Sequence, residues 1–363
     1  MKVGIITFHA SHNYGSILQA YALQQTIIGL GHECQIINYR TPIQRKLYNP
    51  IFLKRKWVVS LDIIRYPIIA FKDVCKHRLF KKFMDKNYIL TSKTYSTPEE
   101  LKKESFNFDC FISGSDQIWN PVCKDFSSAY YLDFVKKGRK IAYAPSMGPY
   151  PEIREEGIKH FISKNLLLYD SISVRESGTA IKIRELINKD VKITADPTLL
   201  LKSYEWDSIS GERPIINGEY ILLYTPWYEY YTELYDHAAQ LAERSNIKVI
   251  CTLPEGYKKW HKNSYFNFFT IVGPKEFLNL IKYARVVLCG SFHAVVFSLI
   301  FNKPFYAYKG MEDSRITQLL KLTHLENRAE IPSSLLNEEI TYDKSLLNGF
   351  IEDSLEFLKE SLS

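Results

Sequence analysis

The sequence predicts an α/β protein built from two Rossmann-like, doubly wound domains. Short apolar runs alternate with helical segments in both halves of the chain, which is the pattern of parallel sheets covered by helices. The 363 residues also exceed the roughly 250–300 at which single hydrophobic cores stop growing. Between the halves, residues 196–218 lack periodicity and hold Pro197, Gly211, Pro214 and Gly218, so we expect the domain boundary there.

The N-terminal domain is expected to span residues 1–200. Residues 3–8 predict a strand, 16–30 a helix closed by Gly31, and 34–39 a second strand, which together form a βαβ unit with parallel strands. Further strands are expected at 108–113, 140–146, 171–175 and 192–194, with a helix at 152–165.

The pattern restarts in a C-terminal domain expected at residues 215–340. Apolar runs predict strands at 220–225, 248–253, 285–289 and 305–308. Helical segments separate them at 230–245, 274–283 and 292–302, so a second parallel sheet is expected. Residues 341–363 predict a C-terminal helix.

Positive charge is concentrated in an insert at residues 45–86. This segment holds twelve Lys or Arg against three Asp, whereas the whole chain carries a net charge of +7. Asp62, Arg65 and Pro67 interrupt its apolar residues, so a membrane-spanning helix is not expected. The insert is a helical segment for which two interpretations remain open: peripheral contact with an anionic membrane, or a solvated surface helix.

Cysteine use and the start of the chain indicate a cytoplasmic protein, with a peripheral position at the inner face of the membrane as the alternative. The six cysteines form no CxxC pair, and Cys34, Cys110, Cys251 and Cys289 lie inside apolar strand-like runs. We therefore expect a reducing compartment and no structural metal. Met1-Lys2 leads directly into the first strand, so no export signal is visible.

Polar side chains follow two strands of the N-terminal domain, where ligands of such sheets bind. Small and polar residues precede or open the helix at 16–30: Asn13, Tyr14, Gly15, Ser16 and Gln19. The alternative is that Asn13 and Ser16 only cap that helix. After residue 113 come Ser115, Asp116 and Gln117, which offer hydrogen-bonding groups and an acid or base, with Trp119 as a stacking face or a core residue.

Two further strand ends carry candidate anion-binding residues. Arg175 ends the strand at 171–175 and suits a phosphate or carboxylate, although an ion pair with Glu176 is the alternative. Ser291, Phe292, His293 and Ala294 open the helix at 292–302, where free N–H groups favour an anion beside the imidazole. The chain has no GxGxxG, GxSxG, HExxH or P-loop signature, so dinucleotide-dependent and common hydrolase chemistries are disfavoured.

These loops resemble the polysaccharide pyruvyl transferase family over about residues 1–325. The most specific segments are NYGSILQAYAL, SGSDQIWNP and SFHA, and DSRITQLLKL follows in the matching order. The resemblance implies an architecture like that of GT-B glycosyltransferases, and transfer of pyruvyl from phosphoenolpyruvate to two hydroxyls of one sugar. It further implies His293 as the donor-site histidine, and Arg175 and Arg315 as candidates for donor binding.

This resemblance leads to specific expectations. The C-terminal domain is expected to bind phosphoenolpyruvate, with His293 as proton donor and Asp116 as base in a site between the domains. The acceptor is a sugar of an exopolysaccharide or capsule, or of its lipid-linked precursor. We expect no cofactor, no metal and no nucleic-acid partner. Some relatives have Arg where Ser291 stands and many have Gly where Ala294 stands, which leaves the donor-binding arginine open.

Two other functions compete with this interpretation. A GT-B glycosyltransferase that uses a nucleotide sugar has the same predicted architecture, and fold alone does not fix function. A non-catalytic subunit of a polysaccharide assembly complex, docked through residues 45–86, is the second alternative.

Overall fold

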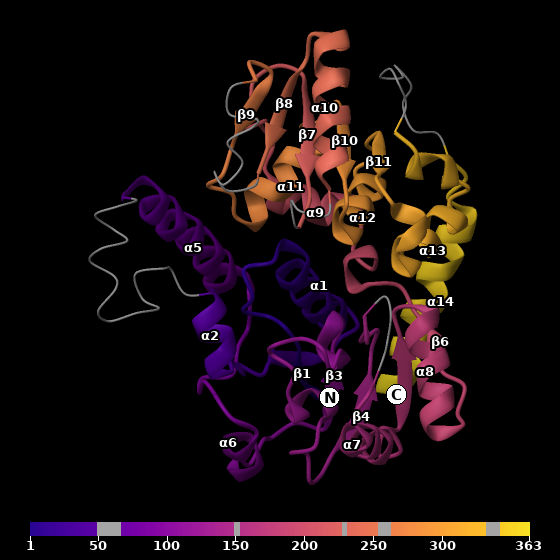
Figure 1. Cartoon of the computed structure of the whole chain (residues 1–363). Helices are drawn as coiled ribbons and strands as arrows, with labels where there is room; N and C mark the ends of the chain where they lie inside the picture. The colour runs from indigo at the N-terminus through magenta and orange to yellow at the C-terminus, as the bar shows by residue number, and fades with distance from the viewer. Residues whose placement is uncertain (49–66, 149–152, 227–230, 253–262, 332–341) are drawn as a thin grey trace. The chain divides into compact units, whose positions relative to one another are not determined.

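The computed structural model describes residues 1–48, 67–148, 153–226, 231–252, 263–331 and 342–363. The chain divides into two compact units, each an α/β structure with a parallel sheet (Figure 1). Unit 1 comprises residues 1–48, 84–201 and 347–363, and unit 2 comprises residues 49–83 and 202–346. The α/β class predicted from the sequence is confirmed.

The sheet of unit 1 has six parallel strands in the order β2-β1-β3-β4-β5-β6. Their bounds are β1 Lys2–Ile6, β2 Glu33–Ile36, β3 Cys110–Ser113, β4 Arg139–Ala142, β5 Ser171–Val174 and β6 Lys192–Ile193. The chain first extends the sheet from β1 to β2 and then returns to add β3 on the other side of β1. The strand order therefore reverses between β1 and β3, which is the topological switch point where doubly wound sheets bind ligands.

Helices cover both faces of this sheet. They are α1 Tyr14–Gly29, α2 Pro42–Tyr48, α6 Pro98–Lys103, α7 Glu156–Leu166, α8 Ser177–Ile187 and α14 Ser345–Leu362, with 3-10 turns η1 Gln117–Trp119, η2 Ser128–Tyr131 and η3 Pro197–Leu199. α1 is buried along most of its length, because it packs beside β2 and also against η3. On the other face, Phe111 and Ile172 join residues of α6, α7 and α8 in one core cluster.

Unit 2 has a five-stranded parallel sheet in the order β11-β10-β7-β8-β9. Its strands are β7 Tyr220–Tyr224, β8 Lys248–Cys251, β9 Phe266–Phe268, β10 Val286–Cys289 and β11 Phe305–Ala307. Its helices are α9 Ser203–Ser210, α10 Thr232–Ser245, α11 Pro274–Tyr283, α12 Phe292–Ile300 and α13 Ser314–Leu322, with turns η4 Gly310–Glu312 and η5 Glu326–Ala329. The switch point of this sheet lies between β7 and β10.

Alternation along β7 explains how both faces of this second sheet are covered. Ile221 and Leu223 point to one face, where they pack in a cluster with residues of α10. Tyr224, on the other face, contacts Phe277 of α11, with ring centroids 4.9 Å apart. Because all five residues of β7 are buried, the strand reads in the sequence as a continuous apolar run, as expected for a central parallel strand.

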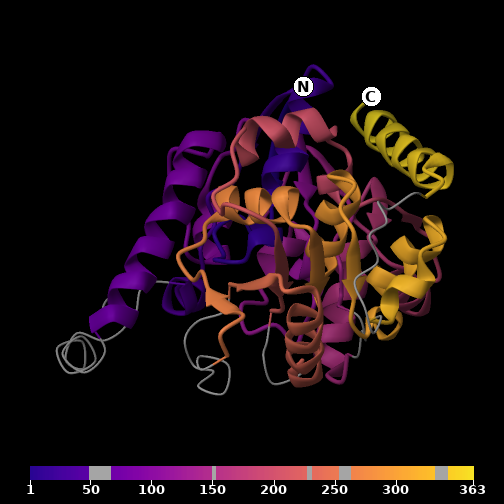
Figure 2. The same ribbon diagram turned by 90° about the horizontal axis from the view of Figure 1, so that it is seen from above.

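The described part of the insert at residues 45–86 includes the end of α2 and nearly all of helix α5 Pro67–Asn87, seen in violet in Figures 1 and 2. The part of the insert at 49–66 lies outside the described residues. Among the described residues, contacts group 67–83 with unit 2 and 347–363 with unit 1. In unit 1, the N–H of Ala195 donates to Ser354 Oγ of α14 at 2.8 Å, and Tyr143 contacts Phe357.

The cysteines of the predicted strands are buried as expected. Cys34, Cys110, Cys251 and Cys289 lie in β2, β3, β8 and β10, and burial raises the pKa of Cys110 and of Cys289 to about 12. These thiols therefore behave as small apolar core residues. Among the residues that the structure describes, no helix combines the length and apolarity needed to cross a bilayer.

Candidate functional site

The switch point of unit 1 joins the two polar loops that the sequence singled out. Ser16 Oγ, in the first turn of α1, donates a hydrogen bond to Asp116 Oδ2 after β3, and both residues are buried. Asn13 caps α1, because its Oδ1 accepts from the N–H groups of Gly15 at 2.9 Å and Ser16 at 3.4 Å. Asn13 thus has a structural role, whereas Ser16 is used to hold Asp116. Tyr14 is buried at the start of the helix.

Gln19 lies one helical turn beyond Ser16 and is fully buried. Its Nε2 donates to Thr7 Oγ1 at 3.0 Å and to the carbonyl oxygen of Ser16 at 2.8 Å. Its Oε1 has no hydrogen-bond partner among the described residues. Because an unsatisfied buried carbonyl is costly, this oxygen is suited to accept a hydrogen bond from a ligand or water.

Asp116 has a backbone conformation that is normally restricted to glycine, with φ 78° and ψ 177°. Such a conformation costs on the order of 1–3 kcal/mol and persists only where neighbours enforce it. Here the carbonyl of Asp116 accepts from the N–H of Ser146 at 2.9 Å, and its Oδ1 accepts from the N–H of Gln117 at 2.8 Å. The side chain of Gln117 is in turn held by Asn120, whose Nδ2 donates to Gln117 Oε1 at 2.8 Å.

Trp119, in the same loop, belongs to the core and does not offer a stacking face. Its ring is fully buried and stacks on Tyr131, with centroids 5.1 Å apart and an interplanar angle of 8°. Its Nε1 donates to the carbonyl of Tyr130 at 3.0 Å. The core alternative, rather than the ligand-stacking interpretation, is therefore correct for this residue.

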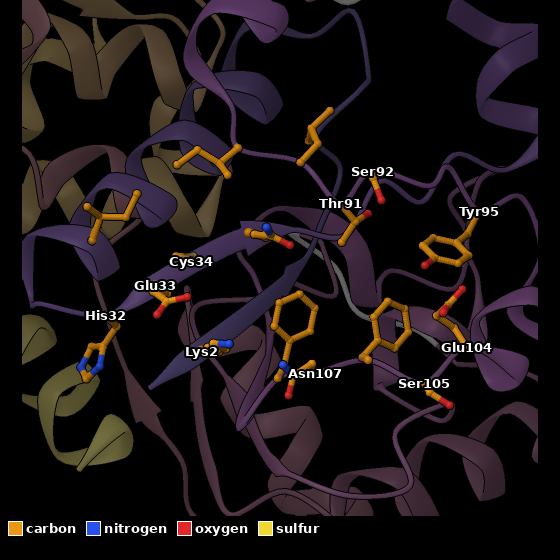
Figure 3. A pocket seen from close by; sticks show the side chains of 16 residues that line it. Lys2, His32, Glu33, Cys34, Thr91, Ser92, Tyr95, Glu104, Ser105 and Asn107 are labelled. Atoms are coloured by element: carbon orange, nitrogen blue, oxygen red, sulfur yellow. The ribbon is translucent and has the colours of Figure 1, made fainter.

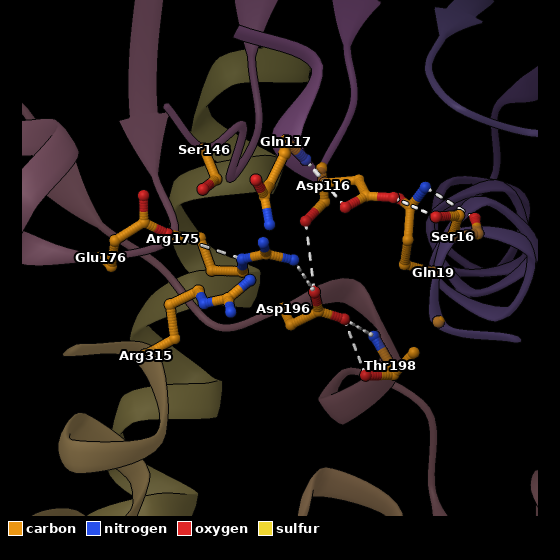
Figure 4. Close-up of polar contacts among 12 residues, drawn as sticks. Ser16, Gln19, Asp116, Gln117, Ser146, Arg175, Glu176, Asp196, Thr198 and Arg315 are labelled. Atoms are coloured by element: carbon orange, nitrogen blue, oxygen red, sulfur yellow. Dashed lines mark hydrogen bonds and ion pairs between the residues drawn. The ribbon is translucent and has the colours of Figure 1, made fainter. Parts of the chain in front are cut away.

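Arg175 is held inside unit 1 by two carboxylates (Figure 4). Its Nη1 lies 3.0 Å from Asp196 Oδ2 and its Nε lies 3.6 Å from Glu176 Oε2, and all three side chains are buried. The ion pair with Glu176, the alternative for this arginine, is thus present. This burial departs from the expectation of a side chain lining an open site, because Arg175 is packed and charge-paired like a core residue.

Asp196 connects this ion pair to the loop after β3. Its Oδ1 accepts from the N–H of Thr198 at 3.0 Å and from Thr198 Oγ1 at 2.7 Å, while its Oδ2 accepts from Ser115 Oγ at 3.3 Å. Sequence reasoning placed Asp196 at the start of a domain boundary and missed its role. The available signal was the segment ADPTLLL, in which an Asp precedes a Pro-initiated turn and caps it.

In unit 2, the switch point is formed where Gly290 and Ser291 follow the end of β10 at Cys289. Tyr231, at the start of α10, donates from its hydroxyl to the carbonyl oxygen of Gly290 at 2.8 Å. Its ring occupies the space that a Cβ at position 290 would need, so glycine is required there. α12 begins directly afterwards, and the side chain of Ser291 makes no capping hydrogen bond to it.

His293 and Arg315 are brought together around Phe292 in unit 2. The imidazole of His293 lies edge-on to the Phe292 ring at 5.0 Å, and the guanidinium of Arg315 lies 5.8 Å from the same ring. Arg315 Nε and Nη2 bind Asp313 at 2.9 and 2.5 Å, which orients the guanidinium. Phe292 and Ala294 are themselves buried. A cation and an imidazole at the start of a helix are groups that can bind an anion and donate a proton.

Two Rossmann-like units, each with a polar site at its switch point, define a two-domain α/β protein of the GT-B-like kind, and solved structures agree. A proposed UDP-N-acetylglucosamine 2-epimerase from Listeria monocytogenes is 10% identical over 99% of this chain and 89% of its own, with a TM-score of 0.53. The Neisseria meningitidis UDP-GlcNAc 2-epimerase bound to UDP-GlcNAc is 13% identical over 100% and 99%, with a TM-score of 0.50. At these identities the likeness establishes the fold alone.

The chain belongs to the polysaccharide pyruvyl transferase family, whose sequence model matches residues 13–309. The match spans both units and includes the loops at Asn13–Ser16, at Ser115–Gln117 and at Ser291–His293. Membership makes the protein a transferase that acts in the modification of polysaccharide. A comparison with curated proteins found no match.

Proposed function

We propose that this protein transfers the pyruvyl group of phosphoenolpyruvate to two hydroxyls of one sugar in a polysaccharide or its lipid-linked precursor. The observation that carries the proposal is the grouping of Arg315 and His293 around Phe292 at the start of α12. Phosphoenolpyruvate has a phosphate and a carboxylate, so its binding calls for a guanidinium and for N–H groups such as a helix N-terminus provides. Family membership supports the same assignment.

The reaction we propose begins with protonation of the donor. His293 gives a proton to the methylene carbon, which becomes the methyl group and leaves an oxocarbenium-like centre at the carbon bearing phosphate. One sugar hydroxyl forms the first C–O bond and loses its proton to the carboxylate of Asp116, from which solvent returns a proton to the imidazole. Phosphate then leaves with its bonding electron pair, the second hydroxyl forms the second C–O bond, and its proton departs with phosphate. The products are a cyclic ketal and inorganic phosphate.

In unit 1, Asp116 is the proposed base toward the acceptor hydroxyls. Its carboxylate is fixed by Ser16 and by the N–H of Gln117, so it does not need to reorganise during the reaction. Arg175 is proposed as a positioning residue, because its ion pair with Asp196 holds the turn that also binds Ser115. No cofactor takes part in this proposal.

The test is incubation of the full chain with phosphoenolpyruvate and a panel of free and lipid-linked glycans. We expect one acceptor to gain the mass of a pyruvyl ketal while inorganic phosphate is released in equal amount. The variant His293→Gln should lose a factor of roughly a hundred to ten thousand in turnover while keeping its melting temperature. His237→Gln, at an exposed position of α10, is the matched control. Glycosyl transfer from a nucleotide sugar with release of a nucleoside diphosphate, and no transfer from phosphoenolpyruvate, would contradict the proposal.

We also propose that α5 makes peripheral contact with an anionic membrane. Ile68 and Phe71 are 64% and 63% exposed near its start. Arg78, Lys82 and Lys86 are exposed further along, and at 100° per residue they share a face with Phe71. An apolar tip that continues into a basic stripe is the pattern of an interfacial helix, in which each cation near an anionic surface contributes about 1 kcal/mol.

Liposome co-sedimentation tests this contact. We expect binding that increases with anionic lipid and falls with salt, and that is weakened by Arg78→Glu with Lys82→Glu. The control pair is Lys136→Glu with Lys137→Glu, exposed positions of unit 1 with the same charge change. Binding that is indifferent to anionic lipid and salt, or an equal loss in both pairs, would contradict it.

A further inference from the structure

A second concave site lies along the outer edge of the sheet of unit 1 (Figure 3). It begins at the amino ends of β1 and β2, where Lys2 and Glu33 line it, and has a volume of about 760 Å³. The Ser16–Asp116 pair lies at the opposite, carboxyl ends of the strands. This edge pocket is therefore separate from the candidate active site of the same unit.

The floor of the edge pocket is aromatic and fixed to the core. Phe106 and Phe108 both line it, each half-buried, with ring centroids 5.8 Å apart and an interplanar angle of 17°. The ring of Phe108 lies 2.6 Å from where a Cβ of residue 4 would stand. Because Gly4 has no Cβ, the Phe108 ring can pack directly against the sheet. Phe106 packs edge-on to buried Phe111 at 5.9 Å. The two rings thus form a flat apolar surface that is already in place without a ligand.

The rim of the edge pocket carries hydrogen-bonding groups of both kinds. Gln35 and Asn107 are exposed there, and each offers an amide donor and an amide acceptor. Glu104 is held by Lys93 Nζ at 2.9 Å and by the Tyr95 hydroxyl, and these two hydrogen bonds keep the pKa of Glu104 below its usual value. In Figure 3, Tyr95, Glu104 and Ser105 lie at one end of the pocket, and His32, Lys2 and Glu33 at the other.

The chemistry of this lining discriminates among ligand classes. An added peptide strand is disfavoured because β2 already has partners on its outer edge: the N–H of Ile36 donates to Ile89 at 2.9 Å, and Gln24 Nε2 donates to the carbonyl of Cys34 at 3.3 Å. An anion would meet no net positive charge, because Glu33 offsets Lys2 and Glu104 pairs with Lys93. A lipid chain would leave the polar rim unsatisfied. A sugar ring matches both features, because it has apolar C–H faces and a periphery of hydroxyls.

We infer that the edge pocket binds an uncharged sugar unit of a glycan, with one face of the ring on Phe106 and Phe108 and its hydroxyls on Gln35, Asn107 and Glu104. The inference rests on the proposed function only in identifying that glycan as the acceptor chain. The pocket then holds a sugar remote from the one that receives the pyruvyl group. The protein therefore binds long acceptors more tightly than short ones, because two linked contacts bind more tightly than either contact alone.

Ligand-observed saturation-transfer NMR on the full chain, without phosphoenolpyruvate, tests this inference. The probes are the methyl glycosides of glucose, galactose, mannose and N-acetylglucosamine. We expect at least one to bind, with the strongest saturation on the C–H protons of one ring face. Gln35→Ala combined with Asn107→Ala should weaken its binding about thirtyfold, since two hydrogen bonds of about 1 kcal/mol each are affected. Asn348→Ala, an exposed site on α14 of the same unit, should bind as the wild type does.

Three results would overturn the edge-pocket inference. The first two are that the wild-type chain binds none of the probes, and that the double variant binds with the same affinity as the wild type. Uniform saturation over both ring faces would argue against stacking on Phe106 and Phe108 and would also count against it. None of these measurements requires pyruvyl transfer. Sugar binding without transfer activity would therefore support the edge-pocket inference and contradict the proposed function. Transfer activity without sugar binding would support the proposed function and contradict the inference.

Discussion

Replacing Arg175 with alanine would separate a structural role from direct donor binding. The Arg175 side chain is 2% exposed, and its removal leaves Asp196 and Glu176 buried without this cation. Breaking a buried ion pair by removing one partner costs about 3–5 kcal/mol. Asp196 keeps its hydrogen bonds from Thr198 and Ser115, so we expect a loss at the lower end of this range, about 3 kcal/mol. Such a loss raises the equilibrium constant for local opening of the structure roughly a hundredfold.

Native-state hydrogen exchange read by mass spectrometry is the appropriate assay, because a chain of two units need not unfold in one step. Peptides covering β3 and β5 should exchange roughly a hundredfold faster in Arg175→Ala. Peptides covering β7 in unit 2 serve as the internal control and should be unchanged. Adding Asp196→Asn should recover part of the protection, since it removes the charge of one of the two carboxylates that pair with Arg175 in the wild type.

Arg175→Lys refines the same test, because it keeps the charge but loses the planar fork that reaches both carboxylates. We expect intermediate protection. The reasoning would be refuted if β5 in Arg175→Ala kept its exchange rate within about threefold of the wild type while phosphoenolpyruvate binding was lost. That result would make Arg175 a donor ligand and not a positioning residue.

Three further predictions follow from single residues. Burial lowers the pKa of His9 from 6.5 to about 4. Between pH 6.5 and pH 4, His9 is therefore protonated in the unfolded chain but not in the folded one. Stability to urea should therefore fall by up to about 3 kcal/mol as the pH drops from 6.5 to 4, and His9→Gln should flatten that slope. Gly290→Ala should clash with Tyr231 and destabilise unit 2 by about 1–3 kcal/mol in thermal melts, and adding Tyr231→Ala should relieve the clash. Asp116→Gly relieves a strained φ while removing the carboxylate, so the urea midpoint should stay near that of the wild type while pyruvyl transfer falls at least about a hundredfold; a large loss of stability would contradict the strain argument.

The strands were predictable from sequence because both faces of each sheet are covered. A run such as Tyr220–Tyr224 has no polar face, so its continuous apolar sequence predicts a buried parallel strand directly. β9 was not predicted, because Phe266–Phe268 is only three residues long and its central Asn267 is exposed. Ser16 and Asp116 were identified since both follow strand ends, but their hydrogen bond joins residues a hundred positions apart and depends on strand order.

Hydrophobic periodicity does not predict which residues pair with Arg175, or which unit a given helix belongs to. Glu176 was weighed because it is adjacent, whereas Asp196 reaches Arg175 only after β5 and β6 have paired side by side. The apolar stripe of α14 predicts a helix but does not say which sheet it covers. The contacts of Ser354 with Ala195 and of Phe357 with Tyr143 place α14 in unit 1.

The discontinuity of unit 1 has a consequence for how the chain is made. The ribosome delivers the six strands of this unit before residue 202, yet α14, which completes it, emerges only after residues 202–346. At about 5–20 residues per second, the nascent unit waits roughly ten to thirty seconds with the surface around Tyr143 and Ala195 uncovered. During that interval it is a substrate for chaperones, and a stop codon placed before α14 would make the exposure permanent and favour aggregation.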